Sequence, residues 1–446
     1  MKYTPSGEDN RRSMLESMGI NNFEELIRHI PDKLIDRDIG LDEGISEYEL
    51  QKTADDRAAA DRPAGSMINF AGMGIYDHYI PPQIKHIAMR PEFYTAYTPY
   101  QAEVSQGTLQ VIYEFQSMIS ELYNMEISNA SMYDGSTSTA EACHMAMGIT
   151  GKKKILISEG LHFTVREVID TYLKGQDIEY HYIPMKNGIT DKDKLAGLID
   201  DSTAGIIIQN PNLYGFIEDM DSIAEIVSNS KSLFIVSQNP ISTGLIKPAG
   251  DYDADIAVGE GQSLGLHMAF GGPLLGIFTA KEKYARRMPG RIIGKTEDEE
   301  GRTGYVMTLQ TREQHIRREK ATSNICTNEG LCLLMAAAYM ELTGRRGFRQ
   351  VSVDSAASAH YLNEQLRTLN GIEMINADSP FFNEFPVRIN NLNDVYSKMK
   401  SKGYLMGVKM DRFIEDEDSM IVMASTEKNS KNDIDNFITE LKGVLK

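Results

Sequence analysis

Cysteine is scarce in this sequence. Only Cys143, Cys326 and Cys332 occur among 446 residues, and none of them has the close paired spacing of a zinc or redox motif. No pair of histidines has zinc-ligand spacing either. We therefore expect three buried thiols in a reducing compartment and no metal site.

Basic residues are outnumbered by acidic ones. The chain has 46 lysines and arginines against 64 aspartates and glutamates, which gives a net charge of -18 and a pI near 5.0. Nucleic-acid phosphates bind to basic surfaces and are repelled by acidic ones. This balance excludes a nucleic-acid partner.

Long apolar runs are also missing. The longest, Leu331 to Met340, has about ten residues, roughly half of the twenty that cross a bilayer. The first residues, Met1 to Pro5, are followed by charged residues and not by the apolar core of a secretory signal. We expect no membrane span, and a cytoplasmic protein.

The N-terminal region shows a helical pattern. Apolar residues recur at helical spacing between Ser6 and about Leu34, with Asn22 as a candidate N-cap. Residues 36–63 are charged, repeat no period well and hold two short helical candidates, which is typical of a segment wrapped over another surface. The sequence predicts an N-terminal helical arm over residues 1–63.

Beyond residue 63, short β-branched runs alternate with amphipathic segments. The strand candidates are residues 154–157, 205–209, 233–236, 256–258 and 274–278, and the helix candidates are 103–123, 163–173 and 222–227. This alternation predicts an α/β domain over residues 64–335, with a mostly parallel sheet covered on both faces. Residues 336–446, with strands at 385–389 and 420–423, are expected to form a small α+β domain.

Two turns follow predicted strands, where open α/β sheets bind ligands. Residues 133–139 are small and hydroxyl-rich and open a helix, so they fit either a phosphate cradle or ordinary helix capping. Residues 259–265 and 270–273 are rich in glycine, which fits an active-site wall or plain architecture.

Two further segments carry polar and aromatic side chains. Residues 94–103 place three tyrosines before a helix, which suits a recognition loop or a core-packed helix entry. Residues 311–324 are charged and fit a solvated helix with i,i+4 pairs. The pattern alone does not decide between recognition and core packing at residues 94–103. It also does not decide between a functional segment and a solvated helix at residues 311–324.

Together these segments resemble the P-protein family of the glycine cleavage system, in particular the N-terminal half of its long form or the first subunit of its split form. The resemblance is carried by residues 97–103, 105–107, 129–131, 140–142, 288–291 and 311–327. The last of these reads TREQHIRREKATSNICT, which is too long to match by chance, and the resemblance covers essentially the whole chain.

The resemblance implies an aspartate-aminotransferase-type fold (fold type I of the pyridoxal-phosphate enzymes) and an oxidoreductase subunit of glycine catabolism. In this family glycine condenses with pyridoxal phosphate and loses carbon dioxide, and the aminomethyl group passes to the lipoyl arm of the H-protein. The cofactor is the electron sink, while the protein supplies orientation and electrostatics.

Two residues that the chemistry requires are absent. The Schiff-base lysine of this fold falls near Ser263, yet no lysine occurs between Lys247 and Lys281. The acid that faces the pyridine nitrogen falls near Asn239, an amide that cannot hold that nitrogen protonated. Lys320 lies in the charged segment at 311–324, outside the region between Lys247 and Lys281 where the lysine is expected. The resemblance therefore implies a subunit with no catalytic residue of its own, inactive alone, whose partner binds pyridoxal phosphate covalently.

In this fold the active site lies between two subunits, and each lends residues to the other. The residues expected to reach the partner's cofactor are Thr322, Ser323 and Asn324, the first two at its phosphate. The residues expected to bind glycine are Tyr97, Thr98, Tyr100, Gln101 and Glu103. The implied partners are a lysine-bearing second subunit, in a heterodimer or a pair of heterodimers, and the H-protein. The alternatives are a complete enzyme with an unrecognised lysine and a purely structural or regulatory partner.

Overall fold

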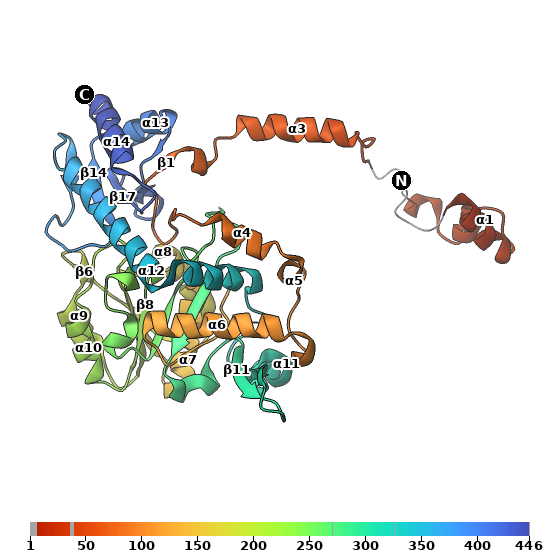
Figure 1. Ribbon diagram of the computed structural model, residues 1–446, viewed down its shortest axis with the longest axis horizontal. Coiled ribbons are helices and arrows are strands. Elements are labelled where there is room, and N and C mark those ends of the chain that lie inside the picture. Colours follow the sequence, from red (N-terminus) through yellow and green to blue (C-terminus); the bar gives the residue numbers. More distant parts are fainter. Residues whose placement is uncertain (1–6, 36–39, 270, 326, 446) are drawn as a thin grey trace. The chain divides into compact units, whose positions relative to one another are not determined.

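The computed structural model describes residues 7–35, 40–269, 271–325 and 327–445. It divides into two compact units, Met1–Arg62 and Pro63–Lys446 (Figure 1). The first unit holds helices α1 (Glu8–Ser17), α2 (Phe23–Ile27) and α3 (Glu47–Ala60), none of which buries a residue. The predicted cap is confirmed, because the Asn22 side chain accepts the Glu25 N–H.

One helix replaces the two short candidates of the charged segment. Ser46 and Glu49 form a reciprocal capping box that starts α3, so its fourteen residues form one continuous helix.

A seven-stranded sheet forms the centre of the second unit. Its order is β2 (Ile127–Ser128), β10 (Gly276–Ala280), β9 (Ile256–Glu260), β8 (Leu233–Ser237), β7 (Thr203–Gln209), β3 (Lys154–Ser158) and β4 (Glu179–Ile183). The five strands from β9 to β4 are parallel, while β10 runs antiparallel to both of its neighbours. The mostly parallel sheet that the sequence predicts is confirmed.

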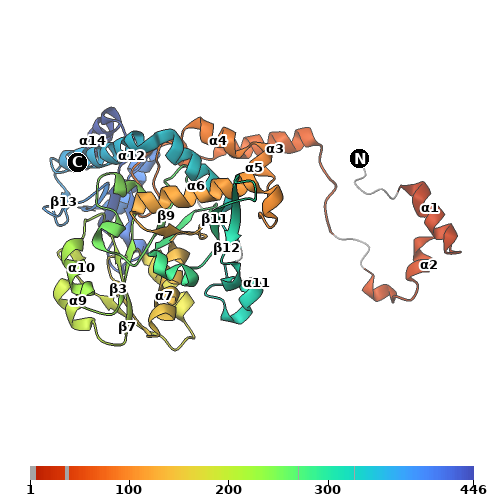
Figure 2. The same cartoon turned by 60° about the horizontal axis from the view of Figure 1, so that its bottom comes forward.

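Helices cover both faces of this sheet. Successive side chains of the buried strands point to opposite faces, so each strand contributes to two cores. Ile206 and Val236 share a core with α6 (Gln106–Tyr123) and the first part of α12 (Gly330–Leu366). Ile207 and Ile235 share the opposite core with α7 (Gly135–Thr150) and α8 (Phe163–Leu173). Figure 2 shows α6 and α12 along one side of the sheet.

A second, smaller sheet lies in the C-terminal part of the chain. Its antiparallel order is β13 (Ile372–Met374), β14 (Glu384–Ile389), β17 (Met420–Ala424) and β16 (Val408–Lys409). Helices α13 (Leu392–Ser401) and α14 (Lys431–Val444) pack on it in a core of its own. Helix α12 contributes to this core as well, after a break at Gly344, so the predicted boundary at residues 335/336 falls inside α12.

The cysteines and the helices bear on two expectations from the composition. Cys143 and Cys332 are buried free thiols, as predicted, whereas Cys326 lies outside the described residues. Throughout the described ranges, none of the helices combines the length and apolar character that a membrane crossing requires.

Candidate functional site

A cavity of about 160 Å³ lies beyond the carboxyl ends of β7, β8 and β9. Its wall includes Gln209, Ser237 and Glu260, the last residues of these strands, and Gln238 and Asn239, which follow β8. The other lining residues are Met73, Gly74, Ile75, Tyr76, Gly135, Ser136, His162, Thr164, Val165, Pro211, Leu274 and Asn383. This is the position at which an open α/β sheet binds its ligand.

The residues at this cavity do not fit the pyridoxal phosphate that the resemblance implies. None of the described lining residues is a lysine. Ser263 is buried, and Asn239 caps a 3-10 turn, Pro240–Gly244, by accepting the Ile241 N–H. The described lining residues therefore offer no amine for a Schiff base, and the position expected to face the pyridine nitrogen holds the amide Asn239.

The hydroxyl-rich turn at the start of α7 is used for capping. Asp134 accepts the Thr137 N–H at 2.6 Å, and Ser138 and Thr139 donate their hydroxyls to backbone carbonyls of the same turn. Of the two alternatives left open by the sequence, helix capping describes these contacts.

The segments 94–103 and 311–324 both contribute to one surface groove, whereas Thr322, Ser323 and Asn324 line neighbouring pockets. The Arg291 guanidinium stands over the Tyr100 ring, 5.6 Å from its centre, and both residues line a surface groove with Gln314 and Ile325. Tyr97 is 80% exposed and Tyr100 60% exposed, so these rings are not packed into the core. Thr98 is half-buried, while Gln101 and Glu103 are exposed.

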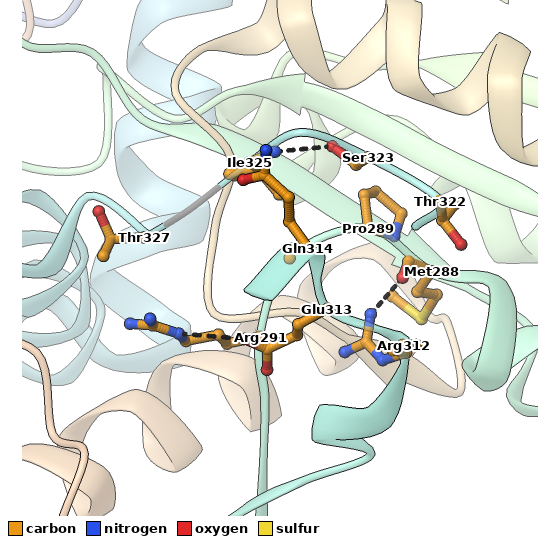
Figure 3. A pocket seen from close by; sticks show the side chains of 11 residues that line it. Met288, Pro289, Arg291, Arg312, Glu313, Gln314, Thr322, Ser323, Ile325 and Thr327 are labelled. Carbon is orange, nitrogen blue, oxygen red and sulfur yellow. Dashed lines mark hydrogen bonds and ion pairs between the residues drawn. The ribbon is translucent and has the colours of Figure 1, made fainter. Parts of the chain in front are cut away.

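Two buried arginines form a narrow pocket beside this groove (Figure 3). Arg312 donates through Nη1 to the Met288 carbonyl, and Arg291 Nε lies 3.7 Å from Glu313 Oε2. Within the described residues, Arg291 Nε and Nη1 and Arg312 Nε and Nη2 have no hydrogen-bond partner. Burial lowers the pKa of Arg312 to about 10. The Glu313 carboxylate lines the same pocket, so the two arginines leave one net positive charge beside their unpaired donors, which suits an anionic oxygen.

The arginine pocket is small. It encloses about 10 Å³, which admits roughly one oxygen-sized atom. Thr322 and Ser323 complete its wall. Neither arginine is among the site residues predicted from the sequence. One feature of the sequence could have indicated this pocket: Arg291 is a charged residue between the Pro289-Gly290 turn and the apolar start of β11 (Ile292–Glu297).

The hydroxyl-bearing residues at 322–324 differ in their partners. Ser323 donates to Glu141 Oε1 at 2.6 Å and accepts the Ile325 N–H. Thr322 makes no side-chain hydrogen bond to any described residue, and Asn324 is exposed. Of the two hydroxyls predicted at a cofactor phosphate, that of Thr322 is therefore the more available.

Glu141 gives this region a pH dependence. Burial raises its pKa to about 7, against the hydrogen bond from Ser323. The folded chain thus holds a proton that the unfolded chain releases near pH 4.5, so stability falls as pH rises from about 4.5 to 7. Glu141→Gln keeps an acceptor for Ser323 and has no proton to lose.

We expect the unfolding free energy of Glu141→Gln, relative to the natural chain, to rise by about 3 kcal/mol between pH 5 and 8. Urea denaturation at both pH values measures this difference, and Glu167→Gln, at an exposed glutamate, is the matched control. Equal pH slopes for the natural chain and Glu141→Gln would contradict the assignment.

Comparisons with known proteins agree over the whole chain. A family model described as "Glycine cleavage system P-protein" matches residues 1–441. The chain is 45% identical over 444 residues to the probable glycine dehydrogenase (decarboxylating) subunit 1 of Carboxydothermus hydrogenoformans, covering 99% of this chain and 100% of the relative.

Solved structures give the same picture. A glycine decarboxylase (P-protein) of the glycine cleavage system, crystallised in inhibitor-bound form, is 38% identical with a TM-score of 0.89, covering 100% of both chains. A glutamate decarboxylase of Lactobacillus brevis is 15% identical with a TM-score of 0.67, covering 93% of this chain and 96% of its own, and shares the fold alone.

Proposed function

This chain belongs to the glycine cleavage system P-protein family, and from that premise we propose that it is the non-catalytic subunit of a two-subunit glycine dehydrogenase (decarboxylating). Both the family resemblance and the aspartate-aminotransferase-type fold predicted from the sequence are confirmed. The partner arrangement, the cytoplasmic setting and the transfer to the H-protein belong to the proposal.

One observation carries the proposal. None of the described residues that line the cavity at the carboxyl ends of the sheet is a lysine, whereas polar and aromatic side chains gather at the surface around the arginine pocket. A chain that kept only its own cavity for chemistry would have no use for exposed Tyr97 and Tyr100 or for unpaired buried guanidinium nitrogens. Such groups are explained if a second subunit brings its active site against them.

In the complex, the partner's lysine holds pyridoxal phosphate, which supplies the electron sink for decarboxylation of glycine. This chain's residues orient and enclose the site. Thr322 donates its hydroxyl to the phosphate, and Arg291 and Arg312 attract an anionic oxygen of the bound groups. Tyr97 and Tyr100 limit the space beside glycine and exclude water, which favours a transition state with less localised charge.

The proposal is tested by expressing the chain alone and together with the second subunit, followed by sizing and visible absorbance. The complex should bind about one cofactor per pair of subunits, and the isolated chain should show no internal-aldimine band. Such a band in the isolated chain would favour a complete enzyme with an unrecognised lysine. An active complex that tolerates every change at Tyr100 and Thr322 would favour a purely structural partner.

Thr322→Ala should weaken retention of the cofactor by the complex about tenfold or more. A hydroxyl that donates to an ionised phosphate contributes roughly 1.5–3 kcal/mol, and this hydroxyl has no competing partner among the described residues. Retention is measured by dialysis and absorbance. Thr322→Ser, which keeps the donor, should retain the cofactor almost as well as the natural chain. Unchanged retention in Thr322→Ala would refute the contact.

A further inference from the structure

Asn129 is completely buried, although its side chain is polar, and it directly follows strand β2. Its backbone N–H donates to the Phe278 carbonyl of β10 at 3.1 Å, which fixes the residue to the central sheet. Its side-chain Nδ2 donates to the Pro289 carbonyl at 3.0 Å, 160 residues further along the chain. Asn129 therefore ties the turn at residues 288–291 to the sheet.

The backbone of this turn is held on both sides of Gly290. Asn129 binds the Pro289 carbonyl, and the Ala130 N–H donates to the Arg291 carbonyl at 2.8 Å. Gly290 has a φ of 72°, and a Cβ atom there would lie 2.8 Å from Asn129 Nδ2. The turn and the amide fit together only because this residue is glycine.

The turn places the Arg291 side chain beneath the surface groove. This side chain is only 6% exposed, and its guanidinium stands over the Tyr100 ring, 5.6 Å from the ring centre. A guanidinium within about 6 Å of a ring centre is attracted to the face of that ring. The centres of the Tyr100 and Tyr97 rings lie 6.4 Å apart, so the contact with Arg291 reaches both tyrosines.

Support from below matters for rings that are as exposed as these. An exposed aromatic side chain ordinarily samples several rotamers, and it loses that freedom when a partner closes over it. A ring that the free chain already holds in one orientation loses less conformational entropy on assembly. Arg291 can give this support only while its own backbone has a fixed position.

We propose that Asn129 is a positioning residue for the reaction. It fixes the turn that places Arg291 over the Tyr100 ring, and it thereby sets the orientation of the aromatic wall that Tyr97 and Tyr100 present to the substrate. This inference rests on the proposed function, since it concerns the site that this chain completes. Asn129 acts through Arg291 and does not itself contact the substrate.

A fluorescent ring at position 100 tests the positioning directly. The chain contains no tryptophan, so Tyr100→Trp gives a single reporter over Arg291 in the full-length chain. Adding either Asn129→Ala or Arg291→Met should lower its anisotropy and raise its acrylamide quenching constant about twofold, because the ring loses its cation. The control is Asn429→Ala, which removes a similar bond, from Asn429 Nδ2 to the Asn69 carbonyl at 3.1 Å, and should leave the fluorescence unchanged.

Kinetics of the assembled complex, with Tyr100 in place, test the consequence for the reaction. Asn129→Ala should lower kcat/KM for glycine about tenfold, because a displaced side chain no longer orients the substrate. Arg291→Met should lower it at least as much, and the double variant should lie within about twofold of Arg291→Met alone, since the two residues act in series. Asn429→Ala may lower the melting temperature but should leave kcat/KM within about twofold of the natural value.

Three results would overturn the proposal. They are unchanged fluorescence on adding Asn129→Ala, changed fluorescence with natural kcat/KM, and losses that add fully in the double variant. If Asn129→Ala does not fold, as judged by circular dichroism, Asn129→Ser, which keeps a shorter polar side chain, takes its place. The fluorescence uses this chain alone, whereas chemical labelling of the complex identifies the lysine-bearing subunit, so failure of this inference and failure of the proposed function are distinguishable.

Discussion

Replacing Arg312 by methionine is expected to lower kcat/KM of the assembled enzyme for glycine by about 100-fold. The guanidinium is buried, and its Nε and Nη2 have no partner among the described residues. Two charge-assisted hydrogen bonds to an anionic oxygen at roughly 1.5 kcal/mol each amount to about that factor. Steady-state kinetics of the purified complex measure it.

The matched control is Arg312→Lys. Lysine keeps the charge but lacks the planar fork, so it should restore only part of the activity. A purely structural role, through the bond to the Met288 carbonyl, would instead lower the melting temperature and leave the kinetics unchanged. Wild-type kinetics in a folded Arg312→Met complex would contradict the anion-binding role.

The second large effect is expected at Tyr97. Glycine offers only a carboxylate and an amine, so a site selects it by excluding the volume of a β-carbon. Tyr97 is 80% exposed here, and we expect the partner's bound substrate to meet its ring. Tyr97→Ala should reduce discrimination against alanine by about tenfold or more, the range that one methylene group commands in a binding pocket.

Competition between glycine and alanine in the complex measures this loss. Tyr97→Phe keeps the ring volume and should retain the discrimination. If Tyr97→Ala assembles normally and still selects glycine as the natural chain does, the ring has no part in selecting the substrate.

The buried strands were predictable because their composition is imposed by their position. β7, β8 and β9 are covered on both faces, and their runs of isoleucine and valine predict that burial directly. The prediction missed β4, because its first four residues alternate between exposed and half-buried, and Glu179 and His181 interrupt any apolar run. Helix α6 begins at Gln106, three residues after the predicted start, since a 3-10 turn, Ala102–Val104, precedes it.

The charged segment at 311–324 shows where local pattern fails. Its i,i+4 charges fit a long helix, yet the structure has one α-helical turn, α11 (Gln314–Arg317), between two 3-10 turns, Gln310–Arg312 and Arg318–Lys320. Arg318 has a positive φ of 53°. Arg312 is drawn inward by the Met288 carbonyl, 24 residues away in the chain. A tertiary contact of this kind overrides helix propensity.

For the candidate site too, the sequence indicates some features and not others. The missing lysine near Ser263 and the missing acid near Asn239 remain predictions, which rest on the order of the strands along the chain. Glu260 and Gly135, by contrast, are 125 residues apart, and no spacing shows that one caps the other. The arginine pocket likewise joins two segments that only the folded chain brings together.

The central claim is that the chemistry of this enzyme depends on a lysine of the partner, with this chain completing the site. The most direct test is borohydride reduction of the assembled complex, followed by peptide mapping of both subunits. The account predicts a phosphopyridoxyl-lysine in the second subunit and none in this chain. A phosphopyridoxyl-lysine in this chain, at Lys320 or anywhere else, would contradict it.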